Sequence, residues 1–259
     1  AKQEQHKRLV WLCRVLILAS FFLIWEIAVR TALINPKYLS APSQVFQSFI
    51  TKFYDPKPDG AILPVHFISS LYLALVGYFA AVIIGIPLGL VMGYSKVFYK
   101  LINPVFEIVR PIPPIAWIPL SVIWLGTTAK GFIIFLAAFV PCVINAYTGV
   151  HQTNPTLINV AKTCGANDWQ IFTTVCIPSA LPLTFTGLRV ALGNSWSTLV
   201  AAELLSAKAG LGYMIQQGRS LVRPDIIIVG MLSIGITGAL LSACLSRVEK
   251  KFVKGRNAR

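Results

Sequence analysis

Long apolar runs alternate with short polar stretches along this chain. A bilayer core roughly 30 Å thick needs about 20 consecutive apolar residues in a spanning helix. The runs do not alternate residue by residue between apolar and polar side chains, as transmembrane β-strands do. The pattern therefore predicts an all-α membrane protein with six transmembrane helices. The expected spans cover residues 9–29, 65–92, 101–125, 131–150, 183–205 and 226–245.

The composition agrees with this pattern. Hydrophobic residues make up 56% of the 259 residues and charged residues 12%, which is too apolar for an ordinary soluble domain. We therefore expect residues 1–259 to form a single transmembrane domain. The first run follows Lys2, Lys7 and Arg8. It is too long for a signal-peptide core and is expected to be a retained anchor helix.

Basic residues set the expected orientation, because cytoplasmic loops carry an excess of Lys and Arg. Both ends of the chain are basic, so both termini are expected in the cytoplasm, in agreement with an even number of spans. The connection containing Lys208, Arg219 and Arg223 then lies outside, against the rule. The formal net charge of +14 does not indicate nucleic-acid binding, because the basic residues lie mostly in loops and tails.

A polar, helix-prone insert separates the fourth and fifth runs. An ordered amphipathic element outside the bilayer indicates a docking partner. Gly165 allows a tight turn after a first short helix. Trp169 and Phe172 are expected to anchor a second helix, and Pro178 and Pro182 are expected to stop it before the fifth span. The residues expected to contact the partner are Val160, Ala161, Cys164, Gly165, Ala166, Trp169, Phe172 and Pro178.

Four prolines interrupt the third run within the nine residues from Pro111 to Pro119. Proline lacks an N–H donor and clashes with the preceding turn, so a regular helix is not expected there. Non-helical backbone at membrane depth is tolerated where it is buried in protein or lines a watery cavity. Glu107 and Arg110, three residues apart, can pair on one helix face. This stretch is expected either to line a transport pathway or to serve as a structural hinge.

The fifth run also contains polar residues. Ionisable groups inside a membrane usually face a bundle interior or a solvated path, although snorkelling at a span end also explains Arg189. Helical spacing puts Asn194 and Thr198 on one face. These two residues are expected either to line a pathway or to form hydrogen bonds between helices. The candidate pathway residues are Glu107, Arg110, Trp117, Arg189, Asn194, Trp196, Ser197 and Thr198.

Other positions indicate packing rather than chemistry. Gly85, Gly89 and Gly93 recur every fourth residue in the second run, a spacing typical of close helix packing. The five cysteines show no C-x-x-C pair, and neither His66 nor His151 has a second histidine or a paired carboxylate nearby in the sequence. We therefore expect no catalytic residue, no disulfide and no metal site.

Three blocks of the sequence resemble the permease subunits of ABC importers. The insert is similar to their cytoplasmic coupling motif, E-A-A, three residues, G, nine residues, I-x-L-P, with Ala161, Gly165 and Pro178 at matching positions. Asn159 and Val160 replace the Glu and the first Ala of that motif. The stretches RPIPPIAWIPLSVIWLG and GLRVALGNSWSTLVAAELLSAKAGLGYMI resemble the corresponding spans of taurine, sulfonate and nitrate importer permeases.

The resemblance implies a type I ABC importer permease fold in a bacterial inner membrane, with residues 159–178 as the cytoplasmic coupling-helix loop. It also implies a homodimer in the lipid bilayer, two cytoplasmic ATP-binding subunits and an external substrate-binding protein. The chain has no G-x-x-x-x-G-K-[ST] phosphate loop. It is therefore expected to be a transport subunit without enzymatic activity or cofactor, while partner subunits bind ATP and Mg²⁺.

The expected substrate is a small anion such as taurine or another sulfonate, for which Arg110 and Arg189 supply suitable charges. Nitrate, bicarbonate and aromatic or heterocyclic substrates are the alternatives within the same family. A secondary transporter can also use broken helices, but it does not need an external coupling helix. A membrane-embedded enzyme needs convergent His, Asp, Glu or Ser groups, which the sequence does not indicate.

Overall fold

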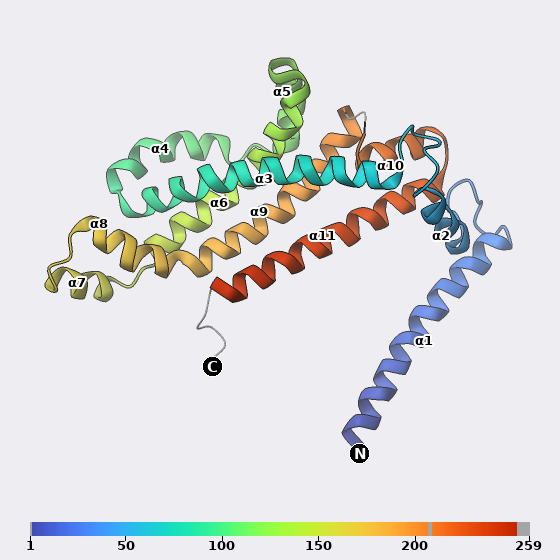
Figure 1. Cartoon of the computed structure of the whole chain (residues 1–259), viewed down its shortest axis with the longest axis horizontal. Helices are drawn as coiled ribbons and strands as arrows, with labels where there is room; N and C mark the ends of the chain where they lie inside the picture. Colours follow the sequence, from blue (N-terminus) through green and yellow to red (C-terminus); the bar gives the residue numbers. More distant parts are fainter. Residues whose placement is uncertain (1, 207–208, 253–259) are drawn as a thin grey trace. The chain divides into compact units, whose positions relative to one another are not determined.

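The computed structural model describes residues 2–206 and 209–252, and helices make up most of this part of the chain (Figure 1). Short 3₁₀ segments cover Pro114–Trp117 (η1) and Gly126–Thr128 (η2), and a π-helical segment covers Phe172–Cys176 (η3). The α-helices are Lys2–Arg30 (α1), Pro42–Thr51 (α2), Leu63–Tyr94 (α3), Lys96–Val109 (α4), Ile118–Leu125 (α5), Ala129–His151 (α6), Pro155–Thr163 (α7), Asp168–Ile171 (α8), Ile177–Ser206 (α9), Leu211–Ser220 (α10) and Pro224–Phe252 (α11). Lys208 and the basic residues from Lys254 to Arg259 lie outside the described residues.

The helices agree with an all-α membrane protein. Five helical segments of the described chain are long and apolar enough to cross a membrane. The expected third span is divided: α4 ends at Val109, residues 111–113 are not helical, and α5 continues through η2 into α6. Pro111, Pro113 and Pro114 remove three backbone donors here, which explains the break. The five segments are Val10–Arg30, Leu63–Tyr94, Pro114–His151, Asp168–Leu204 and Pro224–Lys251.

Backbone contacts divide the described chain into two compact units. The first unit contains α1, α2, the start of α3, α10 and the start of α11. The second unit contains the rest of α3, the helices from α4 to α9, and the remainder of α11. The expected coupling and pathway residues all belong to the second unit.

Close packing of α3, α6 and α9 forms the core of the second unit. Gly85, Gly89 and Gly93 face α6, and a Cβ atom at Gly89 would lie 2.4 Å from the carbonyl oxygen of Val143. The close packing predicted from the glycine spacing is therefore confirmed. The buried residues of this core are Tyr78, Ala81, Ala138, Cys142, Ala191 and Leu192.

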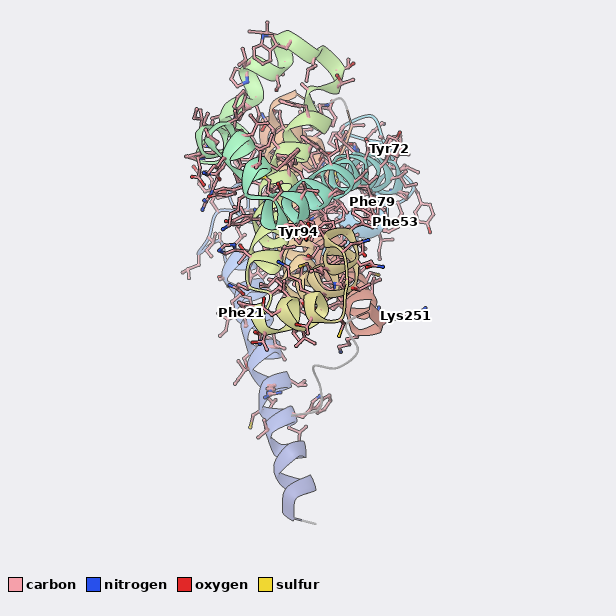
Figure 2. All side chains as sticks on the ribbon, turned by 90° about the vertical axis from the view of Figure 1, so that its left-hand side faces the viewer. Phe21, Phe53, Tyr72, Phe79, Tyr94 and Lys251 are labelled. Atoms are coloured by element: carbon pink, nitrogen blue, oxygen red, sulfur yellow. The ribbon has the colours of Figure 1, made fainter. Side chains whose placement is uncertain are left out.

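The first unit begins with α1, whose apolar side chains from Val10 onward are mostly exposed, as at Phe21 (Figure 2). The helix that follows the first connection is α2, and its N-cap residue is Ala41. Pro42 starts the helix, because the fixed φ of proline suits the first helical position. The Ser43 hydroxyl donates to the Glu26 carboxylate at 2.7 Å.

Candidate functional site

The polar insert folds into α7 and α8, and each helix is capped by an asparagine. The Asn154 side chain accepts a hydrogen bond from the Thr156 N–H at 2.9 Å. The Asn167 side chain accepts from the Gln170 N–H at 2.8 Å, and the Gln170 side chain accepts from the Asn167 N–H at 2.9 Å. These caps satisfy backbone donors that a helix start leaves free. The short spacing from Asn167 to Gln170 is the sequence signal that would have located the second helix.

Gly165 ends α7 in a Schellman turn. Its φ is +83°, a conformation that glycine adopts without steric cost. The Gly165 N–H donates to the Lys162 carbonyl and the Ala166 N–H donates to the Ala161 carbonyl, both at 3.0 Å. This pair of bonds satisfies the last carbonyls of the helix. The tight turn expected at Gly165 is therefore present.

The insert exposes part of its apolar surface. Val160 is 56% exposed and Trp169 is 70% exposed, and the thiol residue Cys164 is exposed as well. Phe172 is buried, with its ring 5.0 Å from that of Tyr94. Phe172 therefore anchors the second half of the insert as expected. Trp169 does not share this role, because the turn of α8 directs it outward.

The two prolines that were expected to stop the second helix do not stop it. Helical structure continues from Asp168 through η3 into α9 and on to Leu204. Pro178 lies in the first turn of α9, directly after the π-helical segment, and Pro182 lies inside α9. A helix accepts proline where the missing N–H has no required partner or where a π-bulge locally changes the hydrogen-bond ladder. The insert and the fifth span thus form one continuous helical path.

Three of the expected pathway residues line one cavity of about 160 Å³ in the second unit. Arg110 reaches it from the end of α4, Trp117 from η1, and Asn194 from α9. The remaining lining residues are apolar, namely Val109, Ile112, Pro114, Leu136, Ala137, Val140 and Pro141. The cavity therefore presents one guanidinium and one amide within an apolar wall.

Arg110 also borders a second cavity, of about 190 Å³, that includes Glu107, Tyr99 and Asn103. The Arg110 Nη1 atom lies 3.4 Å from Glu107 Oε1, so the pairing expected from the sequence is present. Both side chains are about half exposed, at 48% and 52%. An exposed ion pair of this kind contributes only about 0–1 kcal/mol, so Glu107 does not hold the Arg110 guanidinium strongly.

The other pathway candidates on α9 divide between two faces. Asn194 and Ser197 are exposed, whereas Trp196 and Thr198 are buried. Asn194 and Thr198 therefore differ in exposure, although helical spacing puts them on one side. Arg189 is exposed and forms an ion pair with Glu249 on α11. Sequence reasoning missed Glu249, because the two residues are sixty positions apart and no local signal links them.

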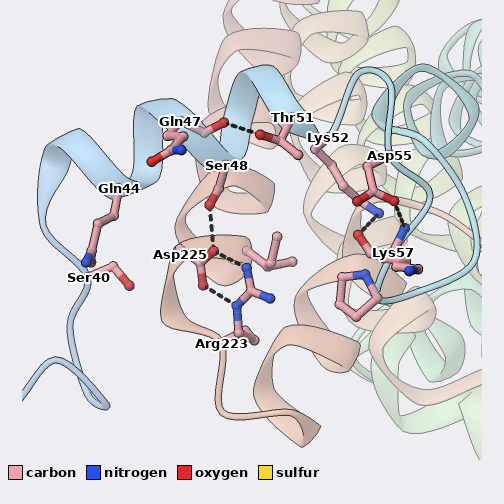
Figure 3. Close-up of a pocket in the computed structure, with 12 residues that line it drawn as sticks. Ser40, Gln44, Gln47, Ser48, Thr51, Lys52, Asp55, Lys57, Arg223 and Asp225 are labelled. Atoms are coloured by element: carbon pink, nitrogen blue, oxygen red, sulfur yellow. Dashed lines mark hydrogen bonds and ion pairs between the residues drawn. The ribbon is translucent and has the colours of Figure 1, made fainter.

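The first unit contains a polar pocket of about 580 Å³ between α2, the loop that follows it and the start of α11 (Figure 3). Arg223 donates two hydrogen bonds to the Asp225 carboxylate, at 2.9 and 2.6 Å. The Ser48 hydroxyl donates to the same carboxylate at 2.6 Å. The hydrogen bond to Asp225 raises the pKa of Arg223, so this guanidinium stays charged. Lys52 lies in the pocket wall.

His66 has a carboxylate partner that the sequence did not indicate. Its Nε2 atom lies 3.2 Å from Asp59 Oδ2, and both side chains are fully buried. The expectation that His66 has no paired carboxylate nearby is therefore wrong. Asp59 reaches His66 because the loop between α2 and α3 folds back over the first turn of α3.

Comparison with known proteins identifies the family. Residues 85–256 match the family described as binding-protein-dependent transport system inner membrane component. The taurine transport system permease protein TauC of Escherichia coli is 37% identical over 237 residues, which cover 91% of this chain and 86% of that permease. The nitrate import permease protein NrtB of Synechocystis is 31% identical, over 91% of this chain and 87% of that one. The chain belongs to this permease family.

A solved structure of the MetNI methionine ABC transporter, in an inward-facing conformation, shares the fold of this permease. The TM-score is 0.63 at 19% identity, and the match covers 73% of this chain and 95% of the other. The type I ABC importer permease fold is therefore confirmed. The protein is a multi-pass inner-membrane permease of the nitrate, sulfonate and taurine type.

Proposed function

We propose that this permease forms the membrane path for a small anion, with taurine or another organosulfonate as the favoured substrate. The observation that carries the proposal is the cavity shared by Arg110, Trp117 and Asn194. A guanidinium and an amide can both donate hydrogen bonds to the oxygens of a sulfonate. The other lining residues are apolar, so Arg110 and Asn194 supply the hydrogen-bond donors of this cavity apart from the Trp117 indole. The similarity to TauC supports the same substrate class.

Arg110 is the better candidate than Arg189 for contact with the anion. Arg189 already has Glu249 as its counter-ion, and the Glu249 side chain is 23% exposed. Arg110 has the weaker partner, at 3.4 Å, and it borders two cavities. In this proposal Trp117 shapes the wall and Asn194 orients the anion, whereas Trp196 and Thr198 support α9 from its buried side.

Energy for transport comes from two cytoplasmic ATP-binding subunits, which hold ATP and Mg²⁺. They dock on the coupling-helix loop at residues 159–178, where Val160, Cys164 and Trp169 offer exposed surface. Because α8, η3 and α9 are continuous, displacement of the loop is carried directly to Asn194. A second copy of the permease completes the path in the bilayer, both termini are cytoplasmic, and an external binding protein delivers the substrate.

The test is uptake of taurine by vesicles that contain the permease with its ATP-binding subunits and binding protein. Arg110→Gln should lower uptake by about tenfold or more, since a hydrogen bond to a charged group contributes about 1.5–3 kcal/mol. Arg219→Gln, which changes an exposed arginine of α10, is the matched control and should retain uptake. Full uptake by Arg110→Gln would reject the role of this cavity.

Nitrate is the second candidate, because NrtB is also similar to this chain. Competition of unlabelled nitrate, bicarbonate and aromatic sulfonates against taurine separates these substrates. Stronger competition by nitrate than by taurine itself would move the assignment to nitrate. Competition by cations alone would reject an anion path.

A further inference from the structure

Three ionisable side chains of the first unit lie together in a buried cluster and are not among the candidate pathway residues. Lys52 follows α2, Asp59 lies in the loop after it, and His66 lies in the first turn of α3. Their side chains are 1%, 0% and 0% exposed. Burial of charged groups is costly unless each has a partner. The hydrogen bonds around Lys52, Asp59 and His66 therefore determine which of the three side chains can be charged in this buried cluster.

Lys52 holds the loop around its ammonium group. The Nζ atom donates to the carbonyl oxygens of Ala61 at 2.7 Å, Lys57 at 3.2 Å and Pro56 at 3.3 Å. It also forms an ion pair with Asp59 Oδ1. Burial alone raises the pKa of the Asp59 carboxyl, but hydrogen bonds from His66 and Lys52 outweigh burial and lower it. The lysine and the aspartate are therefore both charged and neutralise each other.

The hydrogen bond to His66 Nδ1 fits one neutral tautomer of the imidazole. The backbone N–H of Gly210 donates to His66 Nδ1 at 3.1 Å, so Nδ1 carries a lone pair and the proton lies on Nε2, toward Asp59. Gly210 is the N-cap residue of α10 and has a φ of +136°, a conformation that side-chain-bearing residues rarely adopt. His66 therefore joins the start of α3 to the start of α10.

We propose that His66 is an acid-operated latch, which holds Gly210 and the start of α10 while the imidazole is neutral and releases them on protonation. A second proton must bind Nδ1, where it would face the Gly210 N–H, and two donors cannot share a hydrogen bond. The groups around His66 are Asp59, Lys52 behind it and the Tyr213 ring at 6.2 Å. Because Lys52 already neutralises Asp59, the added proton leaves a net positive charge in a buried site.

Hydrogen exchange measured by mass spectrometry on the full-length protein in lipid nanodiscs tests this latch. Peptides that cover residues 209–217 are followed between neutral and acid pH, with correction for intrinsic exchange. Protection at the start of α10 should fall by about tenfold as the pH decreases. Unchanged protection in the wild type over this range would overturn the proposal. The measurement does not depend on transport, so its result is independent of the proposed function.

Two variants sharpen the test. In His66→Asn the side-chain oxygen can occupy the place of Nδ1 and accept from Gly210, but it does not titrate, so its protection should not depend on pH. His151→Asn is the matched control, because His151 is exposed and stacks on Tyr147 at 5.6 Å. It should retain the pH response of the wild type. A pH response in His66→Asn equal to that of the wild type would also overturn the proposal, because it would assign the response to another group.

Discussion

The backbone N–H of Ala166 donates to the carbonyl oxygen of Ala161 at 3.0 Å, across the turn made by Gly165. Both alanines pack against a buried cluster that includes Phe172 and Cys176. The turn therefore fixes α7 against the start of the helical path to α9. The Schellman turn requires a positive φ at position 165, which explains why the glycine of the family motif is present here.

Substitution of Gly165 should act through backbone strain rather than through a clash. A Cβ atom at this position meets nothing within 4 Å, whereas φ is +83°. Gly165→Val should cost about 1–2 kcal/mol in the turn and lower ATP-driven uptake in vesicles. Gly165→Asn should retain most uptake, because asparagine tolerates this conformation. Equal loss in both variants would contradict the explanation by strain.

Gly89 should tolerate even a methyl side chain poorly. A Cβ atom there would lie 2.4 Å from the Val143 carbonyl oxygen, so α3 and α6 would have to separate. Gly89→Ala should lower the free energy of unfolding by about 1–3 kcal/mol, which thermal unfolding in detergent would measure. Gly235→Ala is the matched control, because a Cβ atom at Gly235 meets nothing within 4 Å. Similar melting temperatures for the two variants would show that the contact between α3 and α6 is not tight.

We expect Arg189 to act on uptake through its ion pair with Glu249 and not through contact with the anion. Arg189→Glu and Glu249→Arg should each lower uptake, because each puts like charges together, and the double exchange should restore it. The effect on stability should stay within about 1 kcal/mol, since the arginine side chain is 51% exposed. If Arg189 contacts the anion directly, the double exchange will not restore uptake. Initial rates of uptake at low substrate concentration distinguish these outcomes.

Acid should remove the contribution of Asp59 to stability. A carboxyl whose pKa is lower in the folded state than the ordinary value near 3.8 stabilises the fold above that value, and this stabilisation is lost as the pH falls through the folded value. Asp59→Asn should therefore cost about 3–5 kcal/mol at neutral pH, because Lys52 keeps a buried charge without a counter-ion. The difference from the wild type should be smaller at an acid pH below the ordinary carboxyl value of 3.8 than at neutral pH. Chemical unfolding at both pH values checks this, and a difference independent of pH would contradict it.

Local patterns in the sequence predicted the features that depend on neighbouring residues. The hydropathy runs predicted the spans, the glycine spacing predicted the contact of α3 with α6, and the prolines after Arg110 predicted the break of the third span. In each case the cause lies within one turn or one helix face. Single-sequence reasoning is sufficient for such features.

Features that depend on distant contacts were not predictable in the same way. The pairing of His66 with Asp59 requires the loop to fold around Lys52, and the pairing of Arg189 with Glu249 joins residues far apart in the sequence. The expected stop at Pro178 failed for another reason. Proline also fits the first turn of a helix, and Pro178 lies in the first turn of α9, just after η3.

The π-helical segment η3 also sets the direction in which α9 presents its side chains. A π-bulge adds one residue to the turn, and one residue corresponds to about 100° of rotation about an α-helix axis. Without η3, Asn194 and Ser197 would point about a quarter-turn away from their present direction, relative to α7 and α8. The one extra residue in η3, near the coupling loop, thus determines which side chains of α9 face the cavity.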